Sequence, residues 1–372
     1  MEKELDNLLS KPASYYKSLI VKNNPKFDFK KPVILFGAAK LAPYFIKFFL
    51  EKKTKILALA DNDKKKIQKK LNGFDILSIN NIENKFGKNI QIVATSIFYE
   101  EIINELRKKG FKKLFSPMIF FTLYNNNFDI LTWKNNINLI FKNKKSILKV
   151  YSSLNDKISK KIFLNILKFR LAFNKNIISS IFENKNEYFD KKIIKLKYNE
   201  VFLDGGAYDG DTIKSFLIKS KNIFKNIYAF EPDATNYIFL QKYLNKFKDK
   251  RIKSFKIGLG KRNEKLFFTN EGNLQSKIIS KGKILIKIIP IDDIRNVDFT
   301  YIKLDIEGFE KEALLGGKRT INKLKPKLAI CSYHNIEDLW EVPLLIKKIN
   351  NEYKLYLRHY SNFLFDTICY AI

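Results

Sequence analysis

The chain has 372 residues, which is longer than one hydrophobic core ordinarily supports. Hydrophobic residues make up 45% of it. The composition therefore excludes wholesale disorder and predicts two domains with connecting helices. Lysine and arginine number 70 against 38 aspartates and glutamates, for a formal net charge of +32. The lysines are spread along the whole length, so we interpret them as a solvated surface that favours anionic substrates such as nucleotide sugars, not as a nucleic-acid patch.

Several features predict a cytoplasmic location. The N-terminus lacks the apolar core and small-residue cleavage site of a signal peptide. No stretch approaches the ~20 consecutive apolar residues of a membrane span. Cys331 and Cys369 lie in apolar, strand-like runs, and we expect them to be buried, reduced thiols.

The first part of the chain predicts a helical lead-in, residues 1–29, and a small α/β unit, residues 30–118. Strands and amphipathic helices alternate there, which predicts a parallel sheet with crossover helices. The expected strands are Val33–Phe36, Ile56–Ala60 and Ile90–Ala94, and the expected helices are Leu41–Leu50 and another ending near Gly110.

This α/β unit carries a degenerate Rossmann-like fingerprint. In ILFGAAKLAPYF, Gly37 begins the loop but Ala39 stands where the second glycine of a dinucleotide cradle belongs, and Asp61 follows the second strand. The extra methyl group would crowd a pyrophosphate. The segment resembles the nucleotide-binding-like domain of some sugar-modifying enzymes, and we expect a structural, substrate-holding or dimerising unit at least as much as a cofactor site. Homo-oligomerisation is left open.

The rest of the chain predicts a helical connector, residues 119–199, followed by a second α/β domain, residues 200–372. Five strands separated by helices and then a terminal pair are the outline of a class I methyltransferase sheet, and an inserted hairpin falls between the third and fourth strands. The expected strands are Val201–Asp204, Ile227–Glu231, Ser254–Ile257, Tyr301–Leu304 and Leu328–Tyr333, the terminal pair Leu355–Arg358 and Thr367–Ala371, and the hairpin Glu264–Phe268 and Ile284–Ile288.

The segment VFLDGGAYDGDTIKSF carries the first chemical signal. A buried strand ends in Asp204, and Gly205 and Gly206 allow positive φ and close approach of a ligand to the backbone. A helix follows, with Asp211 as its natural N-cap. The acids of this loop repel a pyrophosphate but suit a cofactor that carries a sulfonium and an ammonium group.

The next strand, in NIYAFEPD, ends in Glu231, 21 residues after Gly210. An acid at this place is positioned to accept hydrogen bonds from ribose hydroxyls. We expect the loop to hold the methionine end of S-adenosylmethionine and Glu231 to bind the ribose. The loop residues expected in this cofactor site are Asp204, Gly205, Gly206, Ala207, Tyr208 and Gly210, together with Thr212 at the start of the helix. The adenine is expected beyond the third strand, near Gly258-Leu259-Gly260.

A second constellation follows the fourth strand, in YIKLDIEGFEKEALLGG. Lys303, Asp305, Glu307 and Glu310 gather where the strand turns into a helix, although Asp305 and Glu307 could merely cap that helix. His334 stands just past the fifth strand, and His359 follows a later one.

Residues 200–372 resemble the FkbM family of methyltransferases. The matching stretches are LDGGAYDGDT, YAFEPD, the hairpin ending in PIDDI, YIKLDIEGFEKEALLGG, KPKLAICSYH, EDLWEVP and LYLRHY. The resemblance implies methyl transfer from S-adenosylmethionine to hydroxyl oxygens of sugars, glycans or other small molecules. It does not cover residues 1–199.

Methyl transfer depends chiefly on positioning, and a hydroxyl acceptor gains from a base. The catalytic candidates are His334 as the base, because its unperturbed pKa lies near neutrality, then Asp305 and Glu307, with Lys303 beside them. Asp305 and Glu307 are alternatively ligands of a divalent metal such as Mg²⁺ or Mn²⁺, whose requirement is left open. Tyr333 and Trp340 fit a sugar-stacking role and core packing equally well. The rival reading is a non-catalytic nucleotide- or sugar-binding scaffold with the same fold.

Overall fold

The computed structural model describes residues 1–128, 135–183, 187–268, 278–279 and 284–372. The chain forms two compact units, which we describe separately. The N-terminal unit comprises Glu2–Lys142 and Lys168–Asn174, and the C-terminal unit comprises Asn143–Leu167 and Lys175–Ile372 together with Met1. The domain limits expected from the sequence remain predictions.

The N-terminal unit is built on one sheet with the strand order β3-β4-β2-β1-β5-β6. Every pairing is parallel except that of β3 with β4. The sequence predicted the three central strands and missed the short outer ones, which are only two to four residues long. The strands are β1 (Val33–Phe36), β2 (Ile56–Ala60), β3 (Lys70–Leu71), β4 (Phe74–Leu77), β5 (Gln91–Ala94) and β6 (Lys113–Phe115).

Helices bury two apolar clusters in this unit. Ile79 and Ile82 of α4 and Leu106 of α5 join strand residues such as Ile34 in an aliphatic cluster. A second cluster is aromatic, and Phe120 has rings of α3 within 5.4–5.8 Å of its centroid. The helices are α1 (Glu2–Ser10), α2 (Ala13–Lys22), α3 (Ala42–Glu51), α4 (Ile79–Phe86), α5 (Tyr99–Lys108), α6 (Pro117–Leu123) and α7 (Asn138–Lys142).

The expected connector is helical only in part. Its later helices are α8 (Lys144–Ser153), α9 (Lys157–Ala172), which contributes residues to both units, and α10 (Lys175–Ser179). Residues 187–199 contain no helix. There the chain instead places Tyr188, Phe189, Ile193 and Ile194 in the core of the C-terminal unit, because a run of apolar residues can cover a sheet without helical periodicity.

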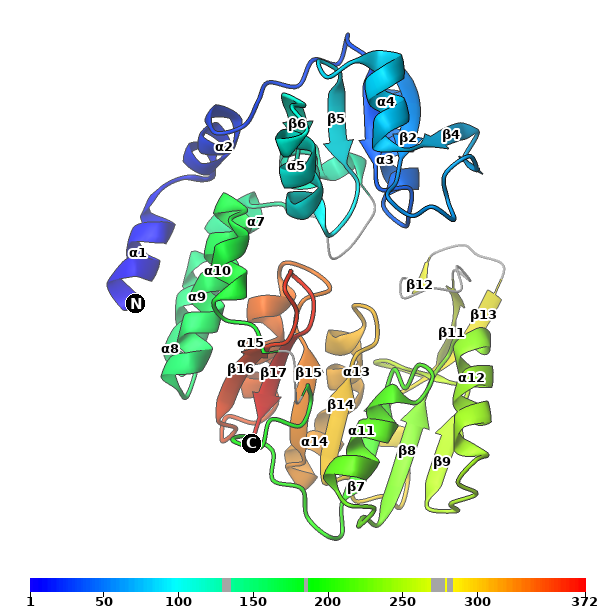
Figure 1. Ribbon diagram of the computed structural model, residues 1–372. Coiled ribbons are helices and arrows are strands. Elements are labelled where there is room, and N and C mark those ends of the chain that lie inside the picture. The colour runs from blue at the N-terminus through cyan, green and yellow to red at the C-terminus, as the bar shows by residue number, and fades with distance from the viewer. Residues whose placement is uncertain (129–134, 184–186, 269–277, 280–283) are drawn as a thin grey trace. The chain divides into compact units, whose positions relative to one another are not determined.

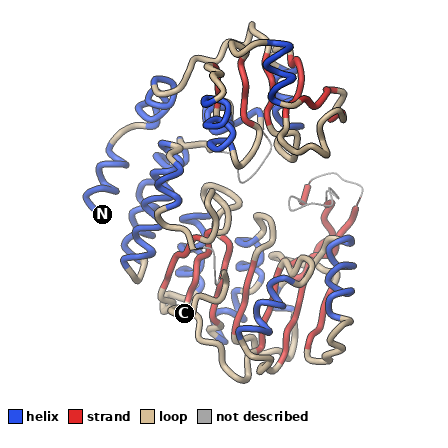
Figure 2. The backbone as a smooth tube through the Cα atoms, viewed as in Figure 1, coloured by secondary structure: helices blue, strands red, loops and turns tan. Residues whose placement is uncertain are grey.

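The C-terminal unit contains a seven-stranded sheet with the order β16-β17-β15-β14-β7-β8-β9. The five strands from β9 to β15 run parallel, and β17 is antiparallel to both of its neighbours. This arrangement confirms the predicted sheet (Figure 2). The strands are β7 (Val201–Gly205), β8 (Asn226–Phe230), β9 (Ile252–Phe255), β14 (Tyr301–Leu304), β15 (Lys327–Cys331), β16 (Leu355–His359) and β17 (Thr367–Ala371).

Helices cover both faces of this sheet. Figure 1 shows α11 and α12 over the near face and α13, α14 and α15 behind it. Phe216 of α11 and Leu240 of α12 are buried in the same cluster as Phe202 and Tyr301 of the sheet. The helices are α11 (Asp211–Lys219), α12 (Ala234–Leu244), α13 (Glu310–Gly316), α14 (Lys318–Leu324) and α15 (Asp338–Ile349).

The insertion between β9 and β14 is a small second sheet. Its strand order is β10-β13-β11-β12, and β11 pairs with β13 as the predicted hairpin. The strands are β10 (Gly258–Leu259), β11 (Glu264–Phe268), β12 (Ile278–Ile279) and β13 (Ile284–Ile289).

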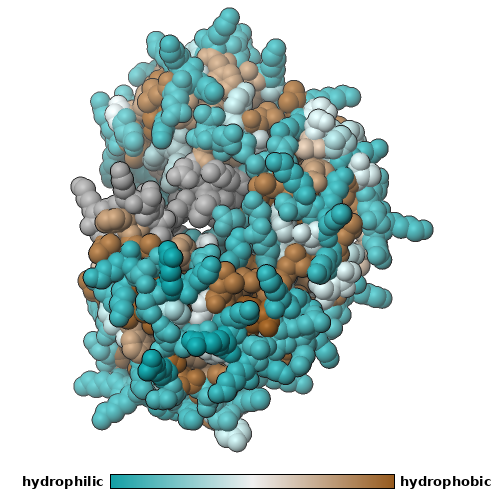
Figure 3. Space-filling model, turned by 180° about the vertical axis from the view of Figure 1, so that it is seen from behind, coloured by the Kyte–Doolittle hydropathy of each residue, from teal (hydrophilic) through white to brown (hydrophobic). Residues whose placement is uncertain are grey.

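Hydrophilic residues cover most of the face seen in Figure 3, as expected for lysines spread along the sequence. Within the described residues, no helix has both the length and the apolar character needed to cross a bilayer. Cys331 and Cys369 are buried and unpaired with each other, as expected.

Candidate active site

The candidate site lies at the carboxyl ends of β7, β8, β14 and β15. In an open parallel sheet this edge is where ligands bind, because the loops that leave it diverge to opposite faces. Asp204 is the next-to-last residue of β7, Glu231 follows β8, Asp305 follows β14, and His334 stands three residues after β15. The predicted catalytic and cofactor-binding residues are therefore brought to one edge by four different strands.

Close packing within the protein explains the glycines of the loop after β7. Gly206 has φ +77°, and a Cβ atom there would stand 1.8 Å from the carbonyl oxygen of Asp305. Gly205 belongs to β7 and does not have positive φ, contrary to the expectation from its sequence. Its missing Cβ makes room for Leu304, 2.7 Å from where that atom would lie. These glycines therefore allow β7 and β14 to approach each other, rather than making room for a ligand.

Several backbone N–H groups of this loop donate to acceptors within the protein. Those of Gly206 and Ala207 donate to the carbonyl of Phe230, at 2.9 and 3.0 Å, and that of Gly210 donates to Ala207. The expected N-cap was wrong: Gly210, with φ +96°, precedes α11 without a side-chain cap, and Asp211 is the first helical residue. Asp211 instead accepts from the N–H of Thr212 at 2.5 Å. A loop whose N–H groups are used in this way is a poor cradle for phosphate.

Asp204 and Lys303 form a buried ion pair beneath the loop. Lys303 Nζ stands 3.0 Å from Asp204 Oδ1, with side-chain exposures of 2% and 0%. It also donates to the carbonyls of Gly205, at 3.3 Å, and Gly206, at 2.9 Å. Burial raises the pKa of Asp204 to about 6 although Lys303 opposes the shift. Burial alone would lower the pKa of Lys303, but Asp204 and Asp305 outweigh it and raise that pKa. Lys303 thus fixes the loop from within.

Glu231 ties the same loop to the end of β8. Its Oε2 accepts from the N–H of Tyr208 and its Oε1 from that of Asp233, both at 2.9 Å. Tyr208 adopts φ +46°, an uncommon conformation for a residue with a side chain. Burial raises the pKa of Glu231 to about 7, although these two N–H groups oppose the shift. The carboxylate expected on a ribose therefore also holds the backbone of the loop.

Asp305, which follows β14, is held by two tyrosines. Its Oδ2 accepts from the hydroxyl of Tyr188 at 2.9 Å and its Oδ1 from that of Tyr333 at 3.2 Å. Burial would raise the pKa of Asp305, but the positive charges of Lys303 and His334 lower it. Neither Asp305 nor Glu307 caps the following helix, whose N-cap is Phe309 without a side-chain bond. The capping explanation of these two acids is therefore wrong.

His334 is surrounded by three carboxylates. Its Nδ1 lies 3.1 Å from Glu310 Oε1, and its Nε2 lies 3.5 Å from both Asp305 Oδ1 and Glu307 Oε2. Burial alone would lower the pKa of His334, but Glu310, Glu307 and Asp305 raise it to about 10. The ring is then protonated at neutral pH. This removes the reason for which it was expected to be the base, a pKa near neutrality.

Asp305, Glu310 and His334 are close enough together to suggest metal ligation, since one ligand atom of each lies within 4.8 Å of the others. From the sequence, Asp305 and Glu307 were the candidate metal ligands, and Glu310 was noted without an assigned function.

Two further acids of the site were missed. Burial raises the pKa of Glu187 to about 8 and that of Asp366 to about 7, and both sense the charge of Asp305. Neither stands in a recognisable motif, so the only signal is their position in space.

Other expected residues make structural contacts. Trp340 is 1% exposed in α15, so core packing explains it. His359 ends β16, where its Nδ1 lies 2.9 Å from Thr367 Oγ1, and burial lowers its pKa to about 4. A Cβ atom at Gly258 or Gly260 would stand 2.5 or 2.6 Å from Ile288 side-chain atoms, so these glycines pack against β13.

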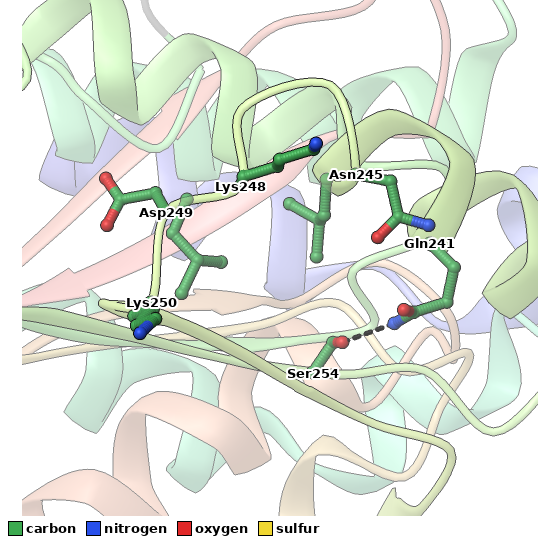
Figure 4. Close-up of a pocket in the computed structure, with 8 residues that line it drawn as sticks. Gln241, Asn245, Lys248, Asp249, Lys250 and Ser254 are labelled. Atoms are coloured by element: carbon green, nitrogen blue, oxygen red, sulfur yellow. Dashed lines mark hydrogen bonds between the residues drawn. The ribbon is translucent and has the colours of Figure 1, made fainter.

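A polar pocket drawn in Figure 4 lies between the end of α12 and the start of β9, at the opposite edge of the sheet from the site. Gln241 donates to Ser254 across it. Its position excludes it from the chemistry at the carboxyl ends of the strands. The lining residues are Gln241, Leu244, Asn245, Lys248, Asp249, Lys250, Ile252 and Ser254.

Comparison with known proteins gives two family matches. Residues 204–360 match the family described as Methyltransferase FkbM domain, and residues 29–114 match the family described as C2185-like, N-terminal. No curated protein matches the chain.

Among solved structures, a methyltransferase FkbM from Methylobacillus flagellatus KT is similar over 100% of this chain and 97% of its own, with 23% identity and a TM-score of 0.78. A precorrin-6y C5,15-methyltransferase from Geobacter metallireducens GS-15 shares 14% identity over 47% of this chain and 80% of its own, with a TM-score of 0.31. The matched region contains all the strand ends described above, and the fold of the whole chain is similar to that of the Methylobacillus flagellatus protein.

Proposed function

We propose that this protein transfers a methyl group from S-adenosylmethionine to a hydroxyl oxygen of a sugar, a glycan or a related small molecule. The observation that carries the proposal is the convergence of Asp204, Glu231 and Asp305 at the carboxyl ends of three adjacent strands, beside a loop in which four N–H groups, from Gly206 to Tyr208 and at Gly210, are already bonded. Carboxylates beside a loop that uses these backbone donors internally suit a cationic donor and a hydroxyl acceptor, and they disfavour a dinucleotide pyrophosphate.

The residues of the β7 and β8 ends fit the donor. The loop from Gly205 to Gly210 would hold its methionine end, with Thr212 at the start of α11 and with the buried pair of Asp204 and Lys303 fixing the loop, and Glu231 would accept from the ribose. The bound donor supplies a methyl group activated by a positively charged sulfur. Glu231 retains acceptor capacity for a hydroxyl, because each carboxylate oxygen has a second lone pair beyond its bond to Tyr208 or Asp233.

The proton of the acceptor hydroxyl must go to a carboxylate, because His334 is protonated at neutral pH. Asp305 already accepts from Tyr188 and Tyr333, and its lowered pKa makes it a weak base. Glu307 is 39% exposed on its side chain and lies 3.5 Å from His334 Nε2. We assign the proton to Glu307, with His334 and Asp305 holding the acceptor and the local charge in place.

The charge of the site favours a neutral acceptor atom. The net charge of +32 belongs to the chain as a whole, whereas the carboxylates of Asp305 and Glu307 lie within 3.5 Å of His334 Nε2. Phosphate groups close to these acids would be repelled. A sugar hydroxyl fits the site, and the diphosphate of a nucleotide sugar would have to lie on the lysine-rich surface outside it.

The test is methyl transfer from isotope-labelled S-adenosylmethionine to a panel of sugars, glycans and nucleotide sugars, compared among the wild type, Glu307→Gln and Glu341→Gln. Glu341 is the matched control, because it is 44% exposed and pairs with Lys311 on α13 and α15. We expect Glu307→Gln to lower kcat by about 10²-fold or more with unchanged binding of S-adenosylhomocysteine, and Glu341→Gln to leave kcat unchanged. A wild type that binds the cofactor but methylates only non-hydroxyl acceptors, or a Glu307→Gln variant with full kcat, would contradict the proposal.

A further inference from the structure

The cluster of Asp305, Glu310 and His334 has the composition and spacing of a metal site. Asp305 follows β14, Glu310 begins α13, and His334 follows β15, so three separate segments supply the side chains. One ligand atom of each lies within 4.8 Å of the other two. Two atoms bound about 2.1 Å from one ion stand at most about 4.2 Å apart, so the side chains need to shift by less than about 1 Å to share it.

Two buried polar atoms of this cluster lack hydrogen bonds to the described residues. Glu310 is 1% exposed and its Oε2 has no partner, while His334 is 2% exposed and its Nδ1 has none of hydrogen-bond geometry despite lying 3.1 Å from Glu310 Oε1. Buried polar groups are nearly always satisfied, and leaving one unsatisfied costs roughly 1–3 kcal/mol. These atoms point to a bound partner inside the cluster.

The surroundings hold two of the ligands in fixed orientations. The N–H groups of Ile306, at 2.8 Å, and Gly308, at 3.4 Å, donate to Glu310 Oε1. The hydroxyls of Tyr188 and Tyr333 donate one to each oxygen of Asp305. Such outer hydrogen bonds orient ligands in metal sites and are as much a part of them as the ligands.

We propose that Asp305, Glu310 and His334 bind one divalent transition metal ion, which would displace the ring proton that the neighbouring carboxylates otherwise hold on His334. Two carboxylates suit Mn²⁺ and an imidazole suits Zn²⁺, so the mixed set favours these ions over Mg²⁺ or Ca²⁺. If the proposed methyl transfer is correct, on which this part of the inference rests, the ion would hold the acceptor hydroxyl beside Glu307.

The first test is titration of chelator-treated protein with Mn²⁺ and with Zn²⁺ by calorimetry, together with ¹⁵N spectra of the histidine rings. The chain has only two histidines, and His359, buried beside Thr367, is an internal control. We expect one ion per chain and a shift of the His334 ring nitrogens with Zn²⁺, while those of His359 stay in place. Absence of binding at millimolar metal, or unmoved His334 signals, would overturn the proposal without any variant.

The second test uses variants of similar size. Asp305→Asn and Glu310→Gln should each weaken metal binding at least about 10-fold, and Glu341→Gln should leave it unchanged. If either of the first two is folded and binds as tightly as the wild type, the proposed ligand set is wrong.

Calorimetry with S-adenosylhomocysteine separates this inference from the proposed function. Donor binding without metal binding would overturn only the metal site. Metal binding by a protein that does not bind the donor would support the site and refute the methyltransferase proposal.

Discussion

Both units place an acid after the second strand of a parallel sheet, and both acids make the same pair of backbone bonds. Asp61 Oδ2 accepts from the N–H of Ala38 in the first loop, and its Oδ1 accepts from Asp63 two residues on, both at 2.9 Å. Glu231 does the same with Tyr208 and with Asp233. An acid at this position therefore fastens the loop in each unit, and its presence alone does not identify a nucleotide site.

The two edges differ in what surrounds the acid. Asp61 is paired with Lys66, whose Nζ lies 3.0 Å from Oδ2. The strand next to β1 on the other side, β5, is followed by Thr95, Ser96, Ile97 and Phe98, whereas the corresponding strand in the C-terminal unit, β14, is followed by Asp305, Glu307 and Glu310. The acids that follow β14 therefore distinguish the candidate site of the C-terminal unit from the corresponding edge of the N-terminal unit.

The largest expected effect on stability comes from replacing glycines, and its size should differ between the two units. Gly206→Ala should prevent folding of the C-terminal unit, because the new Cβ would meet the carbonyl oxygen of Asp305 at 1.8 Å. Gly37→Ala, with the oxygen of Thr95 at 2.9 Å, should cost about 2 kcal/mol. Gly73→Ala, at φ +85° in open space, should cost about 1 kcal/mol. Denaturant unfolding measures all three, and a stable, folded Gly206→Ala would show that the β7–β14 contact is not as tight as described.

The next effect compares two ion pairs of equal length. Lys303 and Lys66 each stand 3.0 Å from a carboxylate, but Lys303 is 2% exposed on its side chain and Lys66 36%. Lys303→Met should lower the free energy of unfolding by about 3–5 kcal/mol, because it leaves Asp204 buried without its partner. Lys66→Met should change it by less than about 1 kcal/mol. Equal effects in urea unfolding would mean that burial does not set the strength of these pairs.

We expect a smaller effect of pH on the stability of the C-terminal unit. In the folded chain the pKa values of Asp204, Glu231, Asp366 and Glu187 are raised to about 6, 7, 7 and 8. Their stabilising contribution is present below their unfolded pKa values, near 4, and is lost as the pH rises through these folded values. The raised pKa of His334 has the same sign, its contribution being lost as the pH rises through about 10.

All five groups belong to the C-terminal unit. Calorimetric unfolding of that unit should therefore shift down by several degrees between pH 5.5 and 8.5, with little change in the N-terminal transition. A transition that moves up over this range would contradict the raised pKa values.

Much of the fold follows from sequence because its signals are local. Val33–Phe36, Ile56–Ala60, Tyr301–Leu304 and Thr367–Ala371 were predicted with their observed bounds, since short apolar runs between turn residues identify buried strands. The strands β3 and β6 were missed because two or three residues carry no periodicity.

The site was harder to predict in detail than in outline. Asp204, Glu231, Asp305 and His334 were predicted at one edge, because strand ends can be read from the sequence. The protonation of His334 could not be predicted, because it depends on the distances to three carboxylates from two segments. Tyr188, which holds Asp305 from 117 residues away, gave no sequence signal.

The central claim is that the donor binds beside Glu231 and not beside Asp61. Calorimetric titration of S-adenosylhomocysteine into the wild type, Glu231→Gln and Asp61→Asn tests it directly, with circular dichroism to verify folding. The account predicts that Glu231→Gln binds roughly 10- to 100-fold more weakly, the loss of a charged acceptor, and that Asp61→Asn binds as the wild type does. A folded wild type that does not bind, or weaker binding only in Asp61→Asn, would contradict it.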